Sequence, residues 1–420
     1  MTAPPPASPA SIRLDSLDII RGVAVLGILL LNIVGFAMPG AAYENPRTYG
    51  GWHGADLLAW AVNFVLFDGK MRGLFSFLFG ASMLLVIERA EAGGRDPARV
   101  HYARMGWLLV FGLAHLWLVW DGDILAHYGL VGMIAYPLRR LPTERLIVLG
   151  LLLAVAATAM FALVPLQVWT VQQAGAAAAE VQAHARQLQS FNDTFGTPSP
   201  QAIAQELAQY RAGYADILRA RFAENATMPF AMLFFFGPET LAYMLLGMAA
   251  FRSGLLTGAW PRHRYRVWLV RCWSVALPAY GALAGWLIVT GFALLPVAVA
   301  SLALSAPLRL LMIVGWICLL QLAARSGGRL TVRLAAAGRM AFTNYLLTSL
   351  ICTTIFYGYG LGWFGQLSRW QLYPIVVGVW AVILLWSKPC LDHFRFGPFE
   401  WLWRSLVGRN LQPMRRTASV

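Results

Sequence analysis

The stretch HLWLVWDGDILAHY, residues 115–128, gathers the side chains of this sequence that are best suited to proton transfer. Asp123 and His127 are four residues apart, so on a helix they share one face and the carboxylate can orient the imidazole. His115 lies late in the preceding apolar run at the same level, and Tyr128 follows His127. Such a group suits a general base or a proton relay, and a polar bracket joining two short helices is the structural alternative.

A second polar group lies in the first apolar run. Asp18 and Arg21 are three residues apart and share a helix face, so they form a helix-entry ion pair, or Arg21 meets a phosphate group that arrives from the cytoplasm. Asn32 follows eleven residues after Arg21. That spacing is about three turns, so Asn32 points along nearly the same face, about 16 Å closer to the outer side. Its amide either binds a neighbouring helix or holds a reacting carbonyl.

The remaining candidates are scattered along the chain. His53, in the sequence WHGAD of the first outer loop, is a solvent-exposed spectator or a general base. Lys70 and Arg72 follow a break at Gly69 and either snorkel or line an opening that attracts an anion. Asn344 lies one turn into a late apolar run. No ligand spacing supports a metal site, and no Walker loop or HExxH motif occurs, so neither a metal nor ATP hydrolysis is predicted.

The elements that must position these side chains are membrane helices. Of 420 residues, 59% are hydrophobic and 12% are charged, whereas roughly a quarter of the residues in a soluble protein are charged. This composition excludes a water-soluble enzyme, a disordered chain and a disulfide scaffold, and we interpret the four separated cysteines as packing residues. A spanning helix needs about 20 apolar residues. Such runs lie near 17–38, 70–88, 105–120, 124–138, 146–168, 228–252, 272–291, 306–323, 340–360 and 371–387.

The distribution of basic residues orients these ten runs. An even number of spans places both termini on one side of the membrane. The segments on that side carry 24 Lys and Arg residues and the opposite segments carry six, which identifies the side of the termini as the cytoplasm. The net charge of +14 is therefore a topology signal, and it argues against nucleic-acid binding. The sequence predicts an all-α polytopic integral membrane protein with about ten transmembrane helices and both termini cytoplasmic.

Two segments interrupt this pattern. Residues 55–68 are apolar but are separated from the second span by Asp68-Gly69-Lys70, so we expect an interfacial or re-entrant helix there. The loop 170–227 has periodic apolar positions and is expected to form amphipathic helices on the outer face. The predicted units are a disordered lead 1–16, a five-span bundle 17–169, the outer loop 170–227, a second five-span bundle 228–391 and an interfacial amphipathic tail 392–420.

Several blocks resemble the YeiB-like membrane proteins, whose C-terminal domain is the domain of unknown function 418. These blocks are LDIIRGVAVLGILLLN, FDGKMRGLFSFLFGAS, GLAHLWLVWDGDILAHYGLVG and GRMAFTNYLLTSLICTTIFYGYGLG. The resemblance runs through nearly the whole chain, with the loop 170–227 covered least. It brings no settled activity with it, and the expected location is a bacterial inner membrane.

The opening pattern is more distantly similar to membrane acyltransferases that pass an acyl group from cytoplasmic acyl-CoA to an extracytoplasmic sugar. The heparan glucosaminide N-acetyltransferases have an Asn eleven residues after an Arg, as Asn32 follows Arg21 here. Their working His lies in the loop after the first span, ahead of a Trp and an Asp, and Trp52, His53 and Asp56 offer these types in another order. The cell-surface O-acyltransferases have His at the place of Asn32, so their single-His mechanism does not apply here.

The favoured hypothesis is an inner-membrane acyltransferase that uses acyl-CoA as co-substrate and no metal. Arg21 would hold the phosphate end, and His115 or His127, oriented by Asp123, or else His53, would take the proton from a sugar or glycolipid acceptor. A proton-coupled transporter of a small anionic solute and a non-catalytic membrane scaffold are the alternatives. Membrane lipid is an expected partner, and association between copies of the chain is left open.

Overall fold

The computed structural model describes residues 9–173, 181–225, 227–324 and 327–416, and within them the chain is helical with no strand. The helices of the N-terminal part are α1 (Pro9–Ala37), α2 (Ala41–Glu44), α3 (Gly54–Leu66), α4 (Lys70–Ala92), α5 (Pro97–Leu118), α6 (Leu125–Ala135), the 3₁₀ turn η1 (Pro137–Arg140) and α7 (Thr143–Gln173). Three helices follow on the outer side: α8 (Val181–Phe195), α9 (Pro200–Arg211) and α10 (Tyr214–Asn225). The C-terminal part comprises α11 (Met228–Arg252), α12 (Arg262–Val289), α13 (Leu294–Ala298), the π-helical segment η2 (Val299–Leu304), α14 (Ser305–Ala323), α15 (Arg329–Arg339), α16 (Ala341–Phe356), α17 (Leu372–His393) and α18 (Pro398–Gly408).

Each of the ten predicted spans corresponds to a helix. Seven helical stretches, those of α1, α3–α4, α7, α11, α12, α13–α14 and α17, are long and apolar enough to cross a membrane. Two of the remaining predicted spans, α6 and α16, are shorter apolar helices, and α5 has 22 residues. The prediction of an all-α polytopic membrane protein is therefore confirmed.

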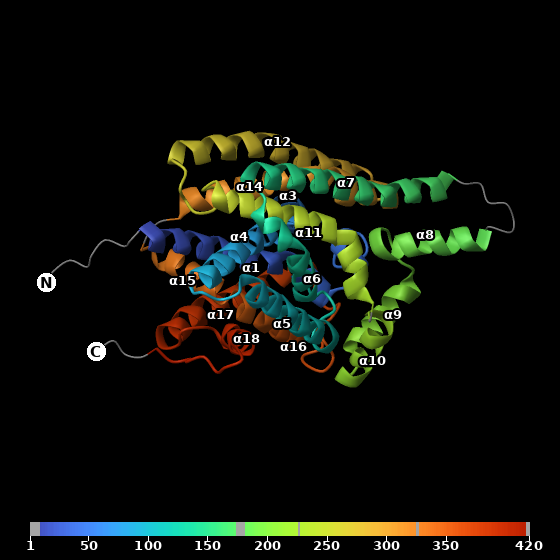
Figure 1. Ribbon diagram of the computed structural model, residues 1–420. Coiled ribbons are helices and arrows are strands. Elements are labelled where there is room, and N and C mark those ends of the chain that lie inside the picture. The colour runs from blue at the N-terminus through green and yellow to red at the C-terminus, as the bar shows by residue number, and fades with distance from the viewer. Residues whose placement is uncertain (1–8, 174–180, 226, 325–326, 417–420) are drawn as a thin grey trace.

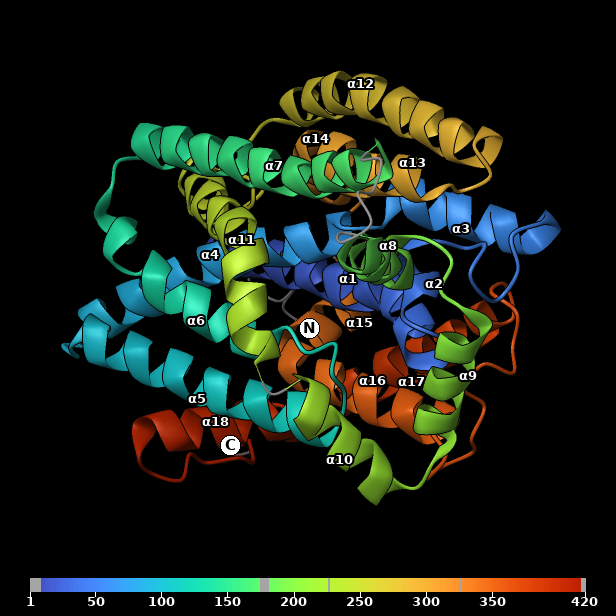
Figure 2. The same cartoon turned by 90° about the vertical axis from the view of Figure 1, so that its right-hand side faces the viewer.

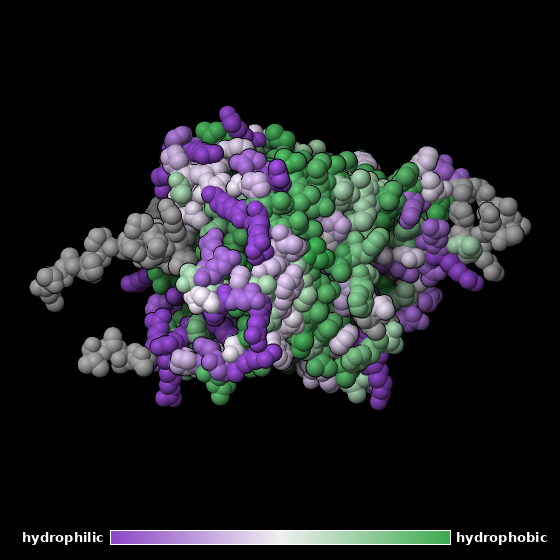
Figure 3. Space-filling model, viewed as in Figure 1, coloured by the Kyte–Doolittle hydropathy of each residue, from purple (hydrophilic) through white to green (hydrophobic). Residues whose placement is uncertain are grey.

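The molecule has two polar ends and an apolar belt between them. The start of α1 and the helix α18 lie at one end, and α8, α9 and α10 lie at the other (Figure 1). Hydrophobic residues cover the surface between these ends (Figure 3). Much of this exposed apolar surface belongs to α7 and α12, which display Val148, Leu152, Val155, Leu163, Val270, Val275 and Val289. The belt is the surface that contacts lipid, so both chain ends lie on one side of the membrane, as the charge distribution predicts.

The predicted break before the second span is present. Helix α3 ends at Leu66, and α4 begins at Lys70. Between them Gly69 has φ +68°, a left-handed conformation that side chains with a Cβ disfavour, and a Cβ there would lie 2.7 Å from Cδ of Arg309. Only glycine satisfies both conditions, so the chain turns here and α4 starts a new helix.

The outer loop forms three helices, as its periodic apolar positions predict. Ile217 of α10 is only 1% exposed, and the Tyr210 hydroxyl of α9 donates to Oδ2 of Asp121 at 2.9 Å. Arg221 donates to the carbonyl of Trp117, in the last turn of α5. Helix α10 lies beside this end of α5 (Figure 2). These contacts fasten α9 and α10 over the outer end of α5; residues 174–180 and 226 of the same loop lie outside the described part.

The two groups of five spans interlock. Helix α11 of the second group packs on α4, α6 and α7 of the first. Gly80 of α4 and Gly247 of α11 each lie directly against the partner backbone, leaving no room for a Cβ. Gly22 of α1 and Gly338 of α15 do the same. Small residues at such crossings let helix backbones approach closely in a membrane, and the whole chain therefore encloses one interior.

Candidate functional site

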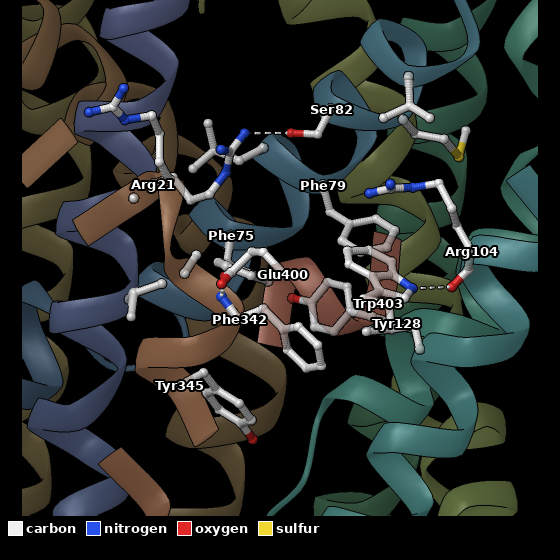
Figure 4. A pocket seen from close by; sticks show the side chains of 18 of the residues that line it. Arg21, Phe75, Phe79, Ser82, Arg104, Tyr128, Phe342, Tyr345, Glu400 and Trp403 are labelled. Atoms are coloured by element: carbon white, nitrogen blue, oxygen red, sulfur yellow. Dashed lines mark hydrogen bonds between the residues drawn. The ribbon is translucent and has the colours of Figure 1, made fainter. Parts of the chain in front are cut away.

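A cavity of about 440 Å³ opens among α1, α4, α5, α6, α16 and α18 (Figure 4). Ligand pockets in proteins measure about 300–1,000 Å³, so a substrate fits this space. The guanidinium groups of Arg21 and Arg104 lie toward one end of the cavity and the ring of Tyr345 toward the other (Figure 4). Aromatic side chains line the space between them, among them Phe75, Phe79, Tyr128, Phe342 and Trp403.

The end nearest the chain termini is strongly basic. We use the name arginine rim for the six cavity-lining arginines, which are Arg21, Arg89, Arg104, Arg339, Arg395 and Arg404. Two carboxylates line the same cavity, and each already has partners. Asp18 accepts from Arg21 at 2.8 Å, and Arg21 also donates to Oγ of Ser82 at 2.7 Å. The predicted pairing of Asp18 with Arg21 is thus present, and the remaining rim charge is available to an anionic ligand.

The second carboxylate, Glu400, holds the start of α16. Its Oε1 accepts from the backbone N–H groups of Phe342 and Thr343, at 2.8 and 3.0 Å, and its Oε2 accepts from the Thr343 hydroxyl. Burial raises the pKa of the Glu400 carboxyl above its ordinary value. Both effects reduce the charge that Glu400 presents to the cavity, so the rim is more basic than its residue count suggests.

The C-terminal helix α18 is a wall of the cavity. Nε1 of Trp403 donates to the Arg104 carbonyl at 3.0 Å, and the Arg104 guanidinium stacks over the Trp403 ring at 4.1 Å. The sequence indicates an interfacial anchor for this segment and does not identify Glu400, Trp403 or Arg404 as cavity residues. The available signal was the single acidic residue in the aromatic and basic sequence FEWLWR, and the structure shows that this glutamate is buried.

The opposite end of the cavity adjoins a buried histidine and carboxylate. Nδ1 of His115 lies 2.8 Å from Oδ1 of Asp123, and the two side chains are 2% and 0% exposed. The His115 ring packs against Tyr345, with 5.3 Å between ring centres, and Tyr345 lines the cavity. Nε2 of His115 is buried without a hydrogen-bond partner in the described part of the chain. When an ionised Asp123 accepts from Nδ1–H, Nε2 carries the free lone pair of a base.

The partner predicted for Asp123 is corrected by this geometry. The spacing predicts that Asp123 orients His127, but Asp123 precedes α6, which begins at Leu125. Its Oδ2 accepts from the backbone N–H of Ala126 at 2.9 Å, as a capping residue does, so its side chain turns back toward His115. The rule for residues four apart applies inside a helix and fails at this position.

His127 belongs to a different buried group. Its Nε2 lies 2.9 Å from Oγ1 of Thr240, and its Nδ1 has no partner among the described residues. Arg72 donates to Oε2 of Glu239 at 2.5 Å, and Arg309 donates to Oε1 of the same carboxylate at 2.7 Å. We call Arg72, His127, Glu239 and Arg309 the outer cluster. Glu239 was missed from the sequence, although an acid in the middle of a 25-residue apolar helix is itself a signal.

Of the other predicted site residues, Tyr128 lines the cavity, and its hydroxyl lies 2.6 Å from Oγ of Ser76. The rest lie apart from the cavity. Lys70 is 1% exposed, with Nζ donating to the Phe64 carbonyl and 3.5 Å from the Tyr280 ring centre, so it neither snorkels nor lines an opening. Three side chains remain to be placed.

His53 is exposed and lies against Trp52, with 4.0 Å between ring centres. Asn32 is half-buried on α1, and its side chain has no hydrogen bond to another described residue. Asn344 is fully buried, donates to the Ala337 carbonyl and accepts from Nε1 of Trp386, so it joins α15, α16 and α17. These contacts assign Asn344 a structural role.

No group of three or more metal-binding side chains is present in the part of the chain that the structure describes. The four cysteines are free thiols, three of them buried. The side chains that bear on the chemistry of the cavity are its arginines, its aromatic lining and the neighbouring His115–Asp123 pair.

Comparisons with known proteins point to one family. The family model described as "Protein of unknown function (DUF418)" matches residues 250–410. The uncharacterized protein YxaH of Bacillus subtilis is 32% identical over 418 residues, which covers 97% of both chains. The uncharacterized protein YeiB of Escherichia coli is 33% identical over 410 residues, 95% of this chain and 97% of its own. No solved structure gives a significant match.

Proposed function

The chain belongs to the DUF418 family of YeiB-like proteins, and we propose that it is a membrane acyltransferase. It would take an acyl group from a cytoplasmic thioester of the acyl-CoA type and pass it to a sugar-like hydroxyl or amine on the outer side of a bacterial inner membrane. One observation carries the proposal: a single cavity connects a rim of six arginines with the surroundings of a buried His–Asp pair.

The donor would bind with its phosphate groups at the arginine rim. Guanidinium groups match phosphate oxygens with paired hydrogen bonds, and four of the six rim arginines are exposed, Arg89, Arg339, Arg395 and Arg404. The aromatic lining would pack along the apolar arm of the donor. Asp18 and Ser82 hold Arg21 in place, so its guanidinium is ordered before a ligand arrives.

His115 would act as the base. As the acceptor oxygen or nitrogen attacks the thioester carbonyl, Nε2 takes its proton, the C–S bond breaks, and the proton passes to the leaving sulfur, which departs as a thiol. Asp123 fixes the ring and stabilises its protonated form. Tyr345 lines the cavity and packs against the His115 ring, so the Tyr345 side chain would have to turn aside for the attacking acceptor to reach Nε2.

The first test is acyl-CoA binding and hydrolysis by the purified protein in nanodiscs, with an Arg21→Ala variant beside it. Arg266→Gln is the matched control, because Arg266 is exposed on α12 and does not line the cavity. Saturable binding that Arg21→Ala weakens and Arg266→Gln leaves unchanged is expected. Absence of binding by folded wild-type protein would overturn the proposal.

A proton-coupled transporter of a small anion is the second candidate, and the ionic outer cluster favours it, since buried charges in membranes often serve ion pathways. A transporter predicts solute uptake into proteoliposomes that depends on a pH gradient, and no acylated product. Acyl transfer predicts a covalent product whether or not a gradient is present.

A further inference from the structure

Acyl transfer from a thioester creates a negative charge that the residues named so far do not stabilise. When the acceptor attacks, the π electrons of the carbonyl move onto its oxygen, and the resulting oxyanion needs hydrogen-bond donors aimed at it. Such a donor must lie in the cavity and close to His115, because the oxyanion and the attacking atom are bound to the same carbon. Tyr345 meets both conditions: it lines the cavity, and its ring packs against the His115 ring with 5.3 Å between ring centres.

The Tyr345 hydroxyl also has a proton to donate. Its oxygen accepts from the backbone N–H of Ile124 at 3.3 Å, and its O–H has no acceptor among the described residues. A phenol is protonated at neutral pH, so this O–H is a free donor. The hydroxyl of Tyr128, which also lines the cavity, instead donates to the Arg72 carbonyl at 3.1 Å. Of these two tyrosines, Tyr345 is therefore the one whose proton is available to a ligand.

The position of this hydroxyl suits a reacting carbonyl. Tyr345 lies at the end of the cavity opposite the arginine rim (Figure 4). Ile124, whose N–H binds the hydroxyl, lines the cavity as well. Ile124 directly follows Asp123, the carboxylate that binds Nδ1 of His115. One short segment before α6 therefore orients both the base and the hydroxyl.

The hydrogen bond to Ile124 leaves the Tyr345 side chain able to move. Its N···O distance of 3.3 Å exceeds the roughly 2.7–3.2 Å of ordinary N–H···O bonds, so it holds the hydroxyl only weakly. The side chain can therefore tilt as the acceptor approaches Nε2 of His115. Catalytic hydrogen bonds are often long before the substrate binds and tighten in the transition state.

We propose that the Tyr345 hydroxyl donates a hydrogen bond to the thioester carbonyl oxygen and stabilises the oxyanion that forms there. This inference rests on the proposed acyl transfer and adds one catalytic residue to it. The acceptor atom bonds to the carbonyl carbon, the π pair of the carbonyl becomes a lone pair of the oxyanion, and Tyr345 keeps its proton throughout. When the C–S bond breaks, the carbonyl forms again, and the proton that His115 took passes to the sulfur.

The test compares acyl-CoA hydrolysis by the full-length wild type and by Tyr345→Phe in nanodiscs, with water as the acceptor. The variant keeps the ring that packs against His115 and loses only the donor. Loss of one oxyanion donor lowers kcat about 10²–10³-fold. We expect kcat and kcat/KM to fall together by this factor, because the bond to the oxyanion exists only in the transition state. Acyl-CoA affinity, measured separately at equilibrium, should stay at the wild-type value.

Tyr357→Phe is the matched control. Tyr357 is a fully buried tyrosine that directly follows α16, and it does not line the cavity. Its hydroxyl has no hydrogen-bond partner among the described residues, so its removal should change neither the rate nor the affinity. Thermal unfolding of all three proteins verifies that each is folded.

The outcomes separate this inference from the proposed function. If Tyr345→Phe hydrolyses acyl-CoA at the wild-type rate, or if only its KM rises, the hydroxyl is not an oxyanion donor, while acyl transfer stands. A faster rate in Tyr345→Phe would show that the hydroxyl only closes the cavity, which also overturns the inference. If folded wild type neither binds nor hydrolyses acyl-CoA, the proposed function fails, and the catalytic role of Tyr345 fails with it.

Discussion

The two polar regions of this molecule use arginine in opposite ways. At the arginine rim, six guanidinium groups face a cavity with two carboxylates; Asp18 pairs with the rim residue Arg21, and Glu400 binds the start of α16. In the outer cluster, Arg72 and Arg309 are both bound to Glu239 inside the protein. Most of the rim charge is therefore available to a ligand, while most of the outer charge is first required by the fold. The same kind of substitution should change affinity in one region and stability in the other.

The largest effect is expected at the base that lies between these regions. Replacing His115 with Ala should slow acyl-CoA hydrolysis roughly 10²–10⁴-fold, the range that a general base contributes. Asp123→Asn should act in the same direction, because the ring loses the carboxylate that orients it. Acyl-CoA affinity should stay unchanged, since neither side chain lines the cavity.

His53→Ala is the matched control, because His53 is exposed on the outer surface. Hydrolysis rates and acyl-CoA binding are measured on all three variants in nanodiscs. If the His115→Ala variant hydrolyses acyl-CoA at the wild-type rate, His115 is not the base, and His127 is the next residue to replace.

The pairing of His115 with Asp123 also shows which features the sequence alone can predict and which it cannot. The ten helices, the break at Gly69 and the Asp18–Arg21 pair follow from local periodicity and spacing, which one segment contains by itself. The partner of Asp123 depends on where α6 begins, a boundary that spacing does not define.

Local sequence rules predict neither the ion pairs of the outer cluster nor the place of α18 as a wall of the cavity. Glu239 meets Arg72 and Arg309 from two other helices, 167 and 70 residues away in the chain. Trp403 reaches the Arg104 carbonyl across 299 residues. Hydropathy indicates that an acid in a span needs a partner, but only the packing of α4, α11 and α14 selects it.

A change in stability is the expected result in the outer cluster. Glu239→Gln leaves Arg72 and Arg309 buried without their counter-ion, and breaking a buried ion pair in this way costs about 3–5 kcal/mol. Thermal unfolding in nanodiscs should show a large loss. Asp216→Asn is the comparison: its pair with Arg219 is exposed, and such pairs contribute about 0–1 kcal/mol. Equal unfolding temperatures for wild type and Glu239→Gln would contradict a structural role for the ion pairs of Glu239 with Arg72 and Arg309.

At the arginine rim the expected change is in affinity. Arg404 is exposed, lines the cavity and stacks over Phe396 at 4.5 Å, so Arg404→Gln should leave stability nearly unchanged. Acyl-CoA should bind about tenfold more weakly, because one charge-assisted phosphate contact is lost. Binding should also become less sensitive to salt, which screens exposed charges. The titration is done at two ionic strengths, and an unchanged affinity at low salt would remove Arg404 from the phosphate site.

The last prediction separates the two regions by the response of their stability to pH. On the outer side, burial and the nearby Asp68 together raise the pKa of Glu44 from 4.5 to about 7, against the lowering influence of Ser301 and Arg309. The folded protein therefore binds more protons than the unfolded chain between these values, and stability should fall as pH rises from about 4.5 to about 7.

The variant Glu44→Gln has no titrating group at this position. Its unfolding temperature should therefore depend less steeply on pH over this range than that of the wild type. Glu91→Gln, at an exposed glutamate near the arginine rim end, should keep the wild-type slope. If Glu44→Gln retains the full wild-type slope, the pH response arises elsewhere, and the buried carboxyl of Glu400 at the arginine rim becomes the group to replace next.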